Sequence, residues 1–231
     1  MRIDTWPIPY QVENIQDATA VVIDVLRAST TIITALENGA AGVVPVREVD
    51  EAFEEAKKTP GALIAGERNA LKVEGFDLGN SPFEFDRETV ENRTIVMTTT
   101  NGTQAAAAGK DAARLIVAGF VNADAVVRDL NAWGGHVAIL CAGTRGRYTI
   151  EDAMCAGLLA DRLGGEDICD FTRACRELYR AHKDDFAQFL MDGVHAKNLV
   201  NKGFSRDVEL ALTCDKSDVV PERGKDGVLR G

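Results

Sequence analysis

An acid, an arginine and a row of hydroxyl groups follow the most apolar segment of the chain. In "AVVIDVLRASTT", residues 20–31, the apolar run reaches Asp24, and Arg27, Ser29 and Thr30 come soon after it. A carboxylate at the end of a strand can bind a hard cation or attack phosphorus. An arginine can hold an oxyanion through two parallel hydrogen bonds. The segment therefore predicts a binding site for an anionic group, with an acid beside it.

Two other segments repeat this local pattern. "TIVMTTTNGTQAAAA", residues 94–108, and "HVAILCAGTRGRYTIEDAM", residues 136–154, also pass from an apolar strand through a polar loop into a helix. In an open parallel sheet such loops lie at the carboxyl ends of the strands, so we expect the three loops to share one cleft. The helix N-termini would favour an oxyanion there. Taken singly, each loop fits ordinary helix initiation better.

A charged loop with several glycines follows another short strand. The segment "AGERNALKVEGFDLGNSPFEF", residues 65–85, contains Glu67, Arg68, Lys72 and Asp77. A solvated surface loop would explain this composition. Long charged loops are also where α/β enzymes keep their binding groups, so these residues are candidates for the same cleft.

Two mechanisms with a covalent intermediate can be compared with the sequence. Phosphatases of the haloacid dehalogenase type need a second aspartate two residues after the nucleophile, where this chain has Leu26. A metal-ligand role therefore suits Asp24 better. Cys141 and Arg147 have the C-x5-R spacing of cysteine-dependent phosphatases, but Tyr148 replaces the usual hydroxyl residue that follows. A cysteine that ends an apolar strand is more often a small core residue, so a Cys141-dependent mechanism is the weaker alternative.

The composition indicates an ordinary globular protein and argues against nucleic acids and membranes as its partners. The 231 residues are 45% hydrophobic and 27% charged, with a formal net charge of -10. Without a basic block, this charge argues against nucleic-acid binding. No apolar run reaches the roughly 18 residues of a membrane span, and the first residues do not resemble a signal peptide, so we expect a cytoplasmic protein. Five scattered cysteines without a CxxC pair argue against a disulfide framework and a zinc site.

Apolar strands alternate with helical patterns along the chain, which is typical of an α/β fold with a mostly parallel sheet and helices on both faces. We expect strands at residues 20–25, 42–46, 62–66, 94–98, 115–118 and 136–141. Helices are expected at residues 30–38, 49–58, 103–108, 123–132 and 150–163, and a mostly helical region from residue 167 onward. The simplest interpretation is one compact unit over residues 1–231, with a subdomain boundary near residues 164–167 as the alternative.

Several motifs occur together in an order that is typical of one known family. They are "DVLRASTTI", "GERNALKVEGFDLGNSP", "TTTNGT", "CAGT" with the downstream "EDAMCAG", and "GFSRDVELA". Through these motifs the chain resembles the 2-phosphosulfolactate phosphatase family along nearly its whole length. The resemblance implies an α/β fold and a magnesium-dependent hydrolysis of 2-phospho-3-sulfolactate to 3-sulfolactate and phosphate. This step is associated with coenzyme M biosynthesis.

The resemblance and the residue chemistry together suggest roles for the candidate residues. The residues that we expect to act in catalysis are Asp24, Arg27 and Glu67. The candidate ligands of Mg²⁺ are Asp24 and Glu67, followed by Asp77, Glu151 and Asp152. The candidates for binding the phosphate are Arg27, Arg68, Ser29, Thr30, Asn101, Gly102 and Thr103. The candidates for binding a distal sulfonate or carboxylate are Lys72 and Arg145.

Three other polar residues receive simpler assignments. We expect His182 and His195 at the surface or at helix ends, with the cleft as the alternative for His195, and Asp207 as an acid in the first turn of a helix. Two kinds of function remain open. One is a magnesium-dependent phosphatase that acts on a small anionic phosphorylated acid, as a monomer or a homo-oligomer. The other is a non-catalytic phosphate- or nucleotide-binding module, in which the acids are structural.

Overall fold

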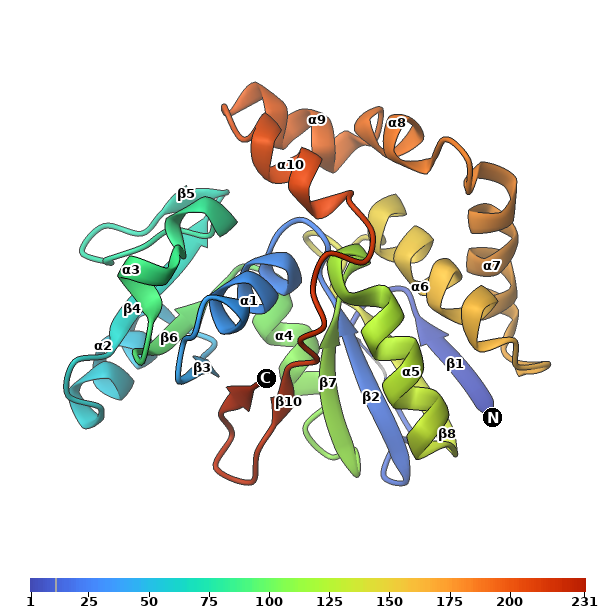
Figure 1. Cartoon of the computed structure of the whole chain (residues 1–231), viewed down its shortest axis with the longest axis horizontal. Helices are drawn as coiled ribbons and strands as arrows, with labels where there is room; N and C mark the ends of the chain where they lie inside the picture. The colour runs from blue at the N-terminus through green and yellow to red at the C-terminus, as the bar shows by residue number, and fades with distance from the viewer. Residues whose placement is uncertain (11) are drawn as a thin grey trace.

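The computed structural model describes residues 1–10 and 12–231. Within them, eleven strands form one sheet in the order β5-β4-β6-β3-β11-β10-β7-β2-β8-β1-β9 (Figure 1). The strands are β1 (Arg2–Trp6), β2 (Ala18–Ile23), β3 (Gly42–Pro45), β4 (Leu63–Arg68), β5 (Leu71–Lys72), β6 (Thr94–Thr98), β7 (Arg114–Ala118), β8 (His136–Cys141), β9 (Asp167–Ile168), β10 (Glu222–Arg223) and β11 (Leu229–Arg230). All six expected strands are present, with ends within two residues of the predicted ones.

The sheet consists of two parallel parts that a hairpin joins. Strands β4, β6 and β3 run parallel in one part, and β7, β2, β8, β1 and β9 run parallel in the other. The hairpin of β10 and β11 lies between them, antiparallel to β7 and to β3. Two-residue strands are too short to show an alternating pattern, so the sequence did not predict this hairpin.

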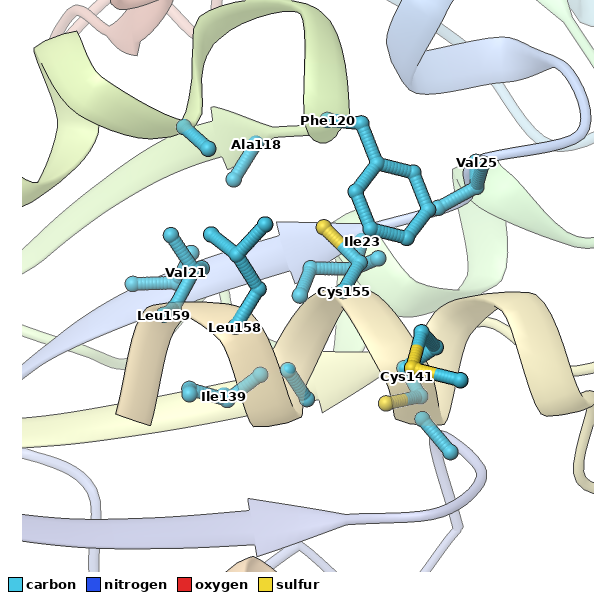
Figure 2. Close-up of a cluster of buried hydrophobic side chains, with 14 of the residues drawn as sticks. Val21, Ile23, Val25, Ala118, Phe120, Ile139, Cys141, Cys155, Leu158 and Leu159 are labelled. Atoms are coloured by element: carbon cyan, nitrogen blue, oxygen red, sulfur yellow. The ribbon is translucent and has the colours of Figure 1, made fainter. Parts of the chain in front are cut away.

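Helices cover both faces of the sheet. They are α1 (Ala28–Glu37), α2 (Val49–Lys58), α3 (Arg87–Val90), α4 (Gly102–Ala108), α5 (Ala123–Trp133), α6 (Ile150–Leu163), α7 (Asp170–His182), α8 (Phe186–Met191), α9 (Val194–Asn201) and α10 (Ser205–Ala211). Alternate side chains of a strand point to opposite faces. Ile23 of β2 accordingly shares an apolar cluster with Leu158 of α6 (Figure 2), whereas Val22 shares another with Ile32 of α1. The expected α/β fold with flanking helices is confirmed.

Helix α4 lies across the two parts of the sheet. It follows β6 in one part, yet it packs against β2 and β8 in the other. At its C-terminal end, a β-carbon on Gly109 would lie 3.2 Å from the side chain of Ala20 in β2. This packing brings the loop after β6 to the carboxyl end of β2, although four strands separate β2 from β6 in the sheet.

The C-terminal region is mostly helical, as predicted. In Figure 1, α8, α9 and α10 lie along the top of the view, above the upward-pointing end of β1. Residues 164–166 connect α6 to β9, which pairs with β1 of the same sheet. In the described part of the chain, no helix has the length and apolar character needed to cross a membrane.

Candidate active site

The three loops that the sequence singled out meet in one cleft of about 330 Å³. Asp24 lines it from the loop after β2, Asn101 from the loop after β6, and Arg145 from the loop after β8. Strand β4, the turn that follows it and the region of α9 contribute Glu67, Asn69, Ala70, His195, Asn198 and Lys202, and the segment before residues 82–84 contributes Asn80. The prediction of one shared cleft is confirmed.

Hydroxyl groups of α1 hold the loop that carries Asp24. The Asp24 amide donates to Ser29 Oγ at 2.9 Å, and the Thr30 hydroxyl donates to the Val25 carbonyl at 3.0 Å. Ser29 and Thr30 are buried and lie outside the cleft lining, so their hydroxyls fix the loop backbone. The Asp24 carboxyl is also buried. Burial raises its pKa to about 6, and the Glu67 carboxylate adds to this shift, although His195 opposes it.

Glu67 lies at the end of β4 and is held by two backbone amides. Its Oε1 accepts a hydrogen bond from the Thr100 amide at 2.8 Å, and its Oε2 accepts one from the Ala70 amide at 2.6 Å. The turn between β4 and β5 consists of Asn69 and Ala70, which both have a left-handed backbone, with φ of 55° and 68°. Such turns match the twist of a hairpin. The hairpin turn thus fixes one carboxylate of the cleft.

Arg27 is buried and held on three sides. Its Nη1 donates to Asp207 Oδ2 at 2.6 Å and its Nη2 donates to the Ala70 carbonyl at 2.9 Å, while its Cζ lies 4.1 Å from the centre of the Phe204 ring. Asp207 Oδ1 accepts a further hydrogen bond from the Ser81 hydroxyl. Asp207 does lie in the first turn of α10, as expected. Its ion pair with Arg27 joins residues 180 positions apart, and local sequence carries no signal for such a contact.

The start of α4 is packed closely against Asp24. A β-carbon at Gly102 would lie 2.8 Å from Asp24 Oδ2, so only glycine fits there without a shift of the carboxylate. The Thr103 hydroxyl donates to the Thr99 carbonyl at 2.9 Å and is absent from the cleft lining. Gly102 and Thr103 therefore shape the wall beside Asp24, and Asn101 is the member of this predicted turn that lines the cleft.

Two exposed cations, Arg145 and Lys202, line the cleft and reach the same residue. Arg145 Nη2 donates to Asn69 Oδ1 at 2.8 Å, and Lys202 Nζ donates to the Asn69 carbonyl at 2.5 Å. The backbone of Arg145 is left-handed, with φ of 50°, and its amide donates to Asn101 Oδ1 at 3.3 Å. Lys202 was missed in the sequence because it lies in a charged helical region, far along the chain from the three loops.

His195 lies in the first turn of α9, a helix end as expected, and it also lines the cleft. Its Nδ1 is 2.8 Å from Glu151 Oε1, which is almost fully buried at the start of α6. Burial lowers the pKa of His195, but the hydrogen bond and the charge of Glu151 outweigh burial and leave the pKa raised. The expectation for His182 holds, since it lies at the end of α7 beside Asp185.

Asp152 connects two of the loops and does not line the cleft. Its Oδ1 accepts a hydrogen bond from the Val25 amide, and its Oδ2 accepts from the Gly143 amide and the Thr149 hydroxyl, at 2.8–3.0 Å. Burial, with the neighbouring charge of Glu151, raises its pKa to about 8. Through these hydrogen bonds, Asp152 joins the loop after β2 to the loop after β8.

Glu151 and three predicted residues from the segment around β4 and β5 also lie outside the lining of the cleft. Asp77 Oδ2 accepts a hydrogen bond from the Ile64 amide at 2.8 Å, and Lys72 Nζ donates to the Asp77 carbonyl. Arg68 donates to the Thr98 hydroxyl at 3.1 Å. These contacts stabilise the segment around β4 and β5. The sequence alone could not tell which charged residues of this segment point into the cleft.

Cys141 is a core residue. Its side chain lies in the apolar cluster between β8 and α6, and Figure 2 shows it among the side chains of that cluster. Burial, with the negative charge of Asp152, raises the pKa of the thiol well above its ordinary value. Because the thiolate is the nucleophilic form, this environment opposes a Cys141-dependent mechanism.

Two side-chain oxygen atoms of the cleft lack a hydrogen-bond donor among the described residues, which leaves them open to other ligands. Asn80 Oδ1 is buried and has no hydrogen-bond partner among the described residues, and the hydrogen bonds of those residues leave Asp24 Oδ2 unused. Magnesium prefers oxygen ligands and commonly uses one or two carboxylates, which Asp24 and Glu67 can supply. No group of three or more His, Cys, Asp or Glu side chains suited to a metal occurs among the described residues.

Comparisons with known proteins agree with the motifs. A family model described as 2-phosphosulpholactate phosphatase matches residues 7–226. A protein of Thermotoga petrophila, named probable 2-phosphosulfolactate phosphatase, is 45% identical over 88% of both chains. Proteins with the same name from Pseudothermotoga lettingae and Caldanaerobacter subterraneus are 40% and 38% identical, over 99% and 94% of this chain and 98% and 92% of theirs. The chain therefore belongs to the 2-phosphosulfolactate phosphatase family.

Proposed function

We propose that this protein hydrolyses the phosphate ester of 2-phospho-3-sulfolactate, or of a similar small 2-phospho acid, with the help of Mg²⁺. The observation that carries the proposal is the meeting of two buried carboxylates, Asp24 and Glu67, with the Arg27 guanidinium in one cleft. The names of relatives that match along most of the chain support the choice of substrate.

The carboxylates of Asp24 and Glu67 suit the hydrolysis of a phosphate ester because they can hold a magnesium ion. A phosphate monoester is extremely slow to hydrolyse in water, so catalysis requires neutralised charge and an aligned nucleophile. Magnesium, when bound, supplies a positive charge for the phosphoryl oxygens and lowers the pKa of a bound water. Asp24 and Glu67 would hold it, with Asn80 Oδ1 as a further oxygen donor. Glu67 is kept in place for this by the amides of Thr100 and Ala70.

Arg27 would orient the phosphate. Asp207 and the Ala70 carbonyl each take one of its N–H groups, which fixes the plane of the guanidinium. Its five N–H donors exceed these two contacts, so donors remain for substrate oxygens. The Phe204 ring covers one face of the group and excludes water from that side.

His195 would supply the proton that the leaving oxygen needs. Its Nδ1 is engaged by Glu151, while no described residue forms a hydrogen bond to its Nε2. The raised pKa favours the protonated form of His195, in which Nε2 carries a proton that it can donate from the cleft to the departing alkoxide.

A panel of substrates tests the proposal. Phosphate release is measured from 2-phosphosulfolactate, 2-phospholactate and 2-phosphoglycerate, each with Mg²⁺. Release that is fastest from the sulfonated ester supports the proposed substrate. Equal rates on all three would support a phosphatase of broader specificity, and no release from any of them would favour the binding module.

We further propose that the reaction takes place in the cytoplasm, as part of coenzyme M biosynthesis where the cell has that route. All five cysteines are free thiols. Free, unpaired cysteines are typical of proteins that work in a reducing compartment. Fractionation of cells that produce the tagged protein, followed by immunodetection, tests this location.

A further inference from the structure

The basic residues of the cleft fall into two groups. Arg27 is buried and forms an ion pair with Asp207. Arg145 and Lys202 are exposed, and among the described residues neither forms an ion pair with a carboxylate. We call Asp24, Arg27 and Glu67 the floor of the cleft, and Asn69, Arg145 and Lys202 its rim. The positive charges of the rim are therefore available to a ligand.

Asn69 brings the two cations of the rim together. Its side-chain oxygen accepts from Arg145 and its backbone carbonyl accepts from Lys202, at 2.8 and 2.5 Å. Both acceptors are neutral, so they position the cations without cancelling their charge. Each cation uses one donor in these contacts, which leaves further donors on the guanidinium and the ammonium group.

The backbone of the rim is held in an unfavourable conformation. Asn69 and Arg145 both have positive φ, which is unfavourable for a residue with a side chain. Asparagine tolerates this region better than most residues, whereas arginine has no such preference. Strained residues of this kind cluster at ligand-binding positions, where the surrounding structure holds them in place.

The proposed substrate carries two anionic groups, a carboxylate and a sulfonate, besides its phosphate. Its phosphate must lie at the floor, beside the carboxylates and Arg27. Its carboxylate is bonded to the carbon that carries the phosphate oxygen, whereas its sulfonate is one carbon further away. The sulfonate is therefore the group that extends furthest from the floor, and the carboxylates of the floor repel it toward positive charge.

We propose that Lys202 and Arg145 form the subsite for the sulfonate of the substrate, with Asn69 as the residue that positions both. Arginine can donate two parallel hydrogen bonds to two sulfonate oxygens, and lysine adds a point charge at the third. The inference rests on the proposed function and deepens it. It replaces Lys72, which the sequence had suggested for this role, with Lys202.

Three variants test the subsite. Lys202→Met removes the charge and keeps the stem of the side chain. Asn69→Asp introduces a carboxylate beside both cations with almost no change in shape. Lys197→Met is the matched control, because Lys197 is exposed on α9, pairs with Asp192 and lies outside the cleft lining. The measurements are kcat/KM for 2-phosphosulfolactate and 2-phospholactate, and the Kd of 3-sulfolactate by calorimetry.

We expect Lys202→Met and Asn69→Asp to lower the preference for the sulfonated ester, the ratio of the two kcat/KM values, by about 10- to 100-fold. The Kd of 3-sulfolactate should rise by a similar factor, and Lys197→Met should change neither quantity. If both variants keep the wild-type ratio and Kd, the subsite is wrong even though the phosphatase stands. If the wild-type protein releases no phosphate from 2-phosphosulfolactate, the proposed function itself fails.

Discussion

The floor and the rim of the cleft are built in different ways. The floor residues Asp24, Arg27 and Glu67 are buried, and they lie at strand ends or in the loop that enters α1. Backbone amides, a carbonyl and the Asp207 carboxylate hold them. The rim residues are exposed and come from a hairpin turn, a loop and the end of α9. Apart from the contacts through Asn69, the cations of the rim remain solvated.

This difference separates two tasks within one small cleft. Buried groups with fixed partners are pre-organised, which suits the transition state of the reaction. Exposed cations on flexible side chains contribute mainly to the capture and selection of a charged substrate. Substitutions in the floor should therefore change turnover or stability strongly, whereas substitutions in the rim should change affinity.

The largest effect is expected for Asp24→Asn. The amide has the shape of the carboxylate but cannot carry its charge, so kcat should fall by about 10³-fold or more while the fold persists. Steady-state phosphate release and circular dichroism measure the two properties. Asp111→Asn, at an exposed position outside the cleft lining, is the control. Wild-type turnover by Asp24→Asn would remove Asp24 from the mechanism.

Asp207→Ala removes the carboxylate that forms an ion pair with Arg27 of the floor. This change leaves the buried Arg27 guanidinium without its carboxylate, and it should lower the free energy of unfolding by about 3–5 kcal/mol. Urea unfolding gives the value. Glu209→Ala on the exposed side of the same helix should stay within about 0.5 kcal/mol of wild type. A loss below 1 kcal/mol for Asp207→Ala would show that the ion pair does little to hold the floor.

His195→Gln tests the proton donor. We expect kcat to fall by about 10²-fold, the lower end of the usual contribution of such a group. Because His195 acts in its protonated form and its pKa is raised, wild-type kcat should decline as the pH rises through that pKa, which lies above that of an ordinary histidine. The variant should lack this decline. His182→Gln is the matched control, and an unchanged pH profile in His195→Gln would argue for a purely structural histidine.

The smallest effect is expected in the turn of Asn69 and Ala70, which contacts both the floor and the rim of the cleft. Ala70 has a φ of 68°, a conformation that glycine adopts without strain. Ala70→Gly should therefore raise the free energy of unfolding by about 0.5–1 kcal/mol, after allowance for the greater freedom of glycine in the unfolded chain. Thermal unfolding measures it, with Gly61→Ala, at an open left-handed position, as the inverse case that should destabilise. A destabilised Ala70→Gly would contradict the strain argument.

The three floor residues were predictable from the sequence, whereas Arg145 was the one rim residue that the sequence suggested for binding the substrate. Asp24 and Glu67 follow apolar strand patterns, and parallel strands bring their ends to one edge, so periodicity and loop chemistry were enough to find them. Lys202 and His195 reach the cleft, and Asp207 reaches Arg27, only because the C-terminal helices pack over this end of the sheet. Such contacts depend on tertiary packing between distant segments. The sequence also suggested the hydroxyls of Ser29 and Thr30 for binding phosphate. In the structure both form hydrogen bonds with the loop backbone instead.

The most direct test of the central claim is the effect of metal removal on phosphate release from 2-phosphosulfolactate. The wild-type protein is assayed with Mg²⁺, after exhaustive treatment with EDTA, and after Mg²⁺ is restored. Our account predicts fast release with Mg²⁺, loss of release after EDTA and recovery on restoration. Release that continues undiminished in EDTA would contradict a magnesium site held by Asp24 and Glu67.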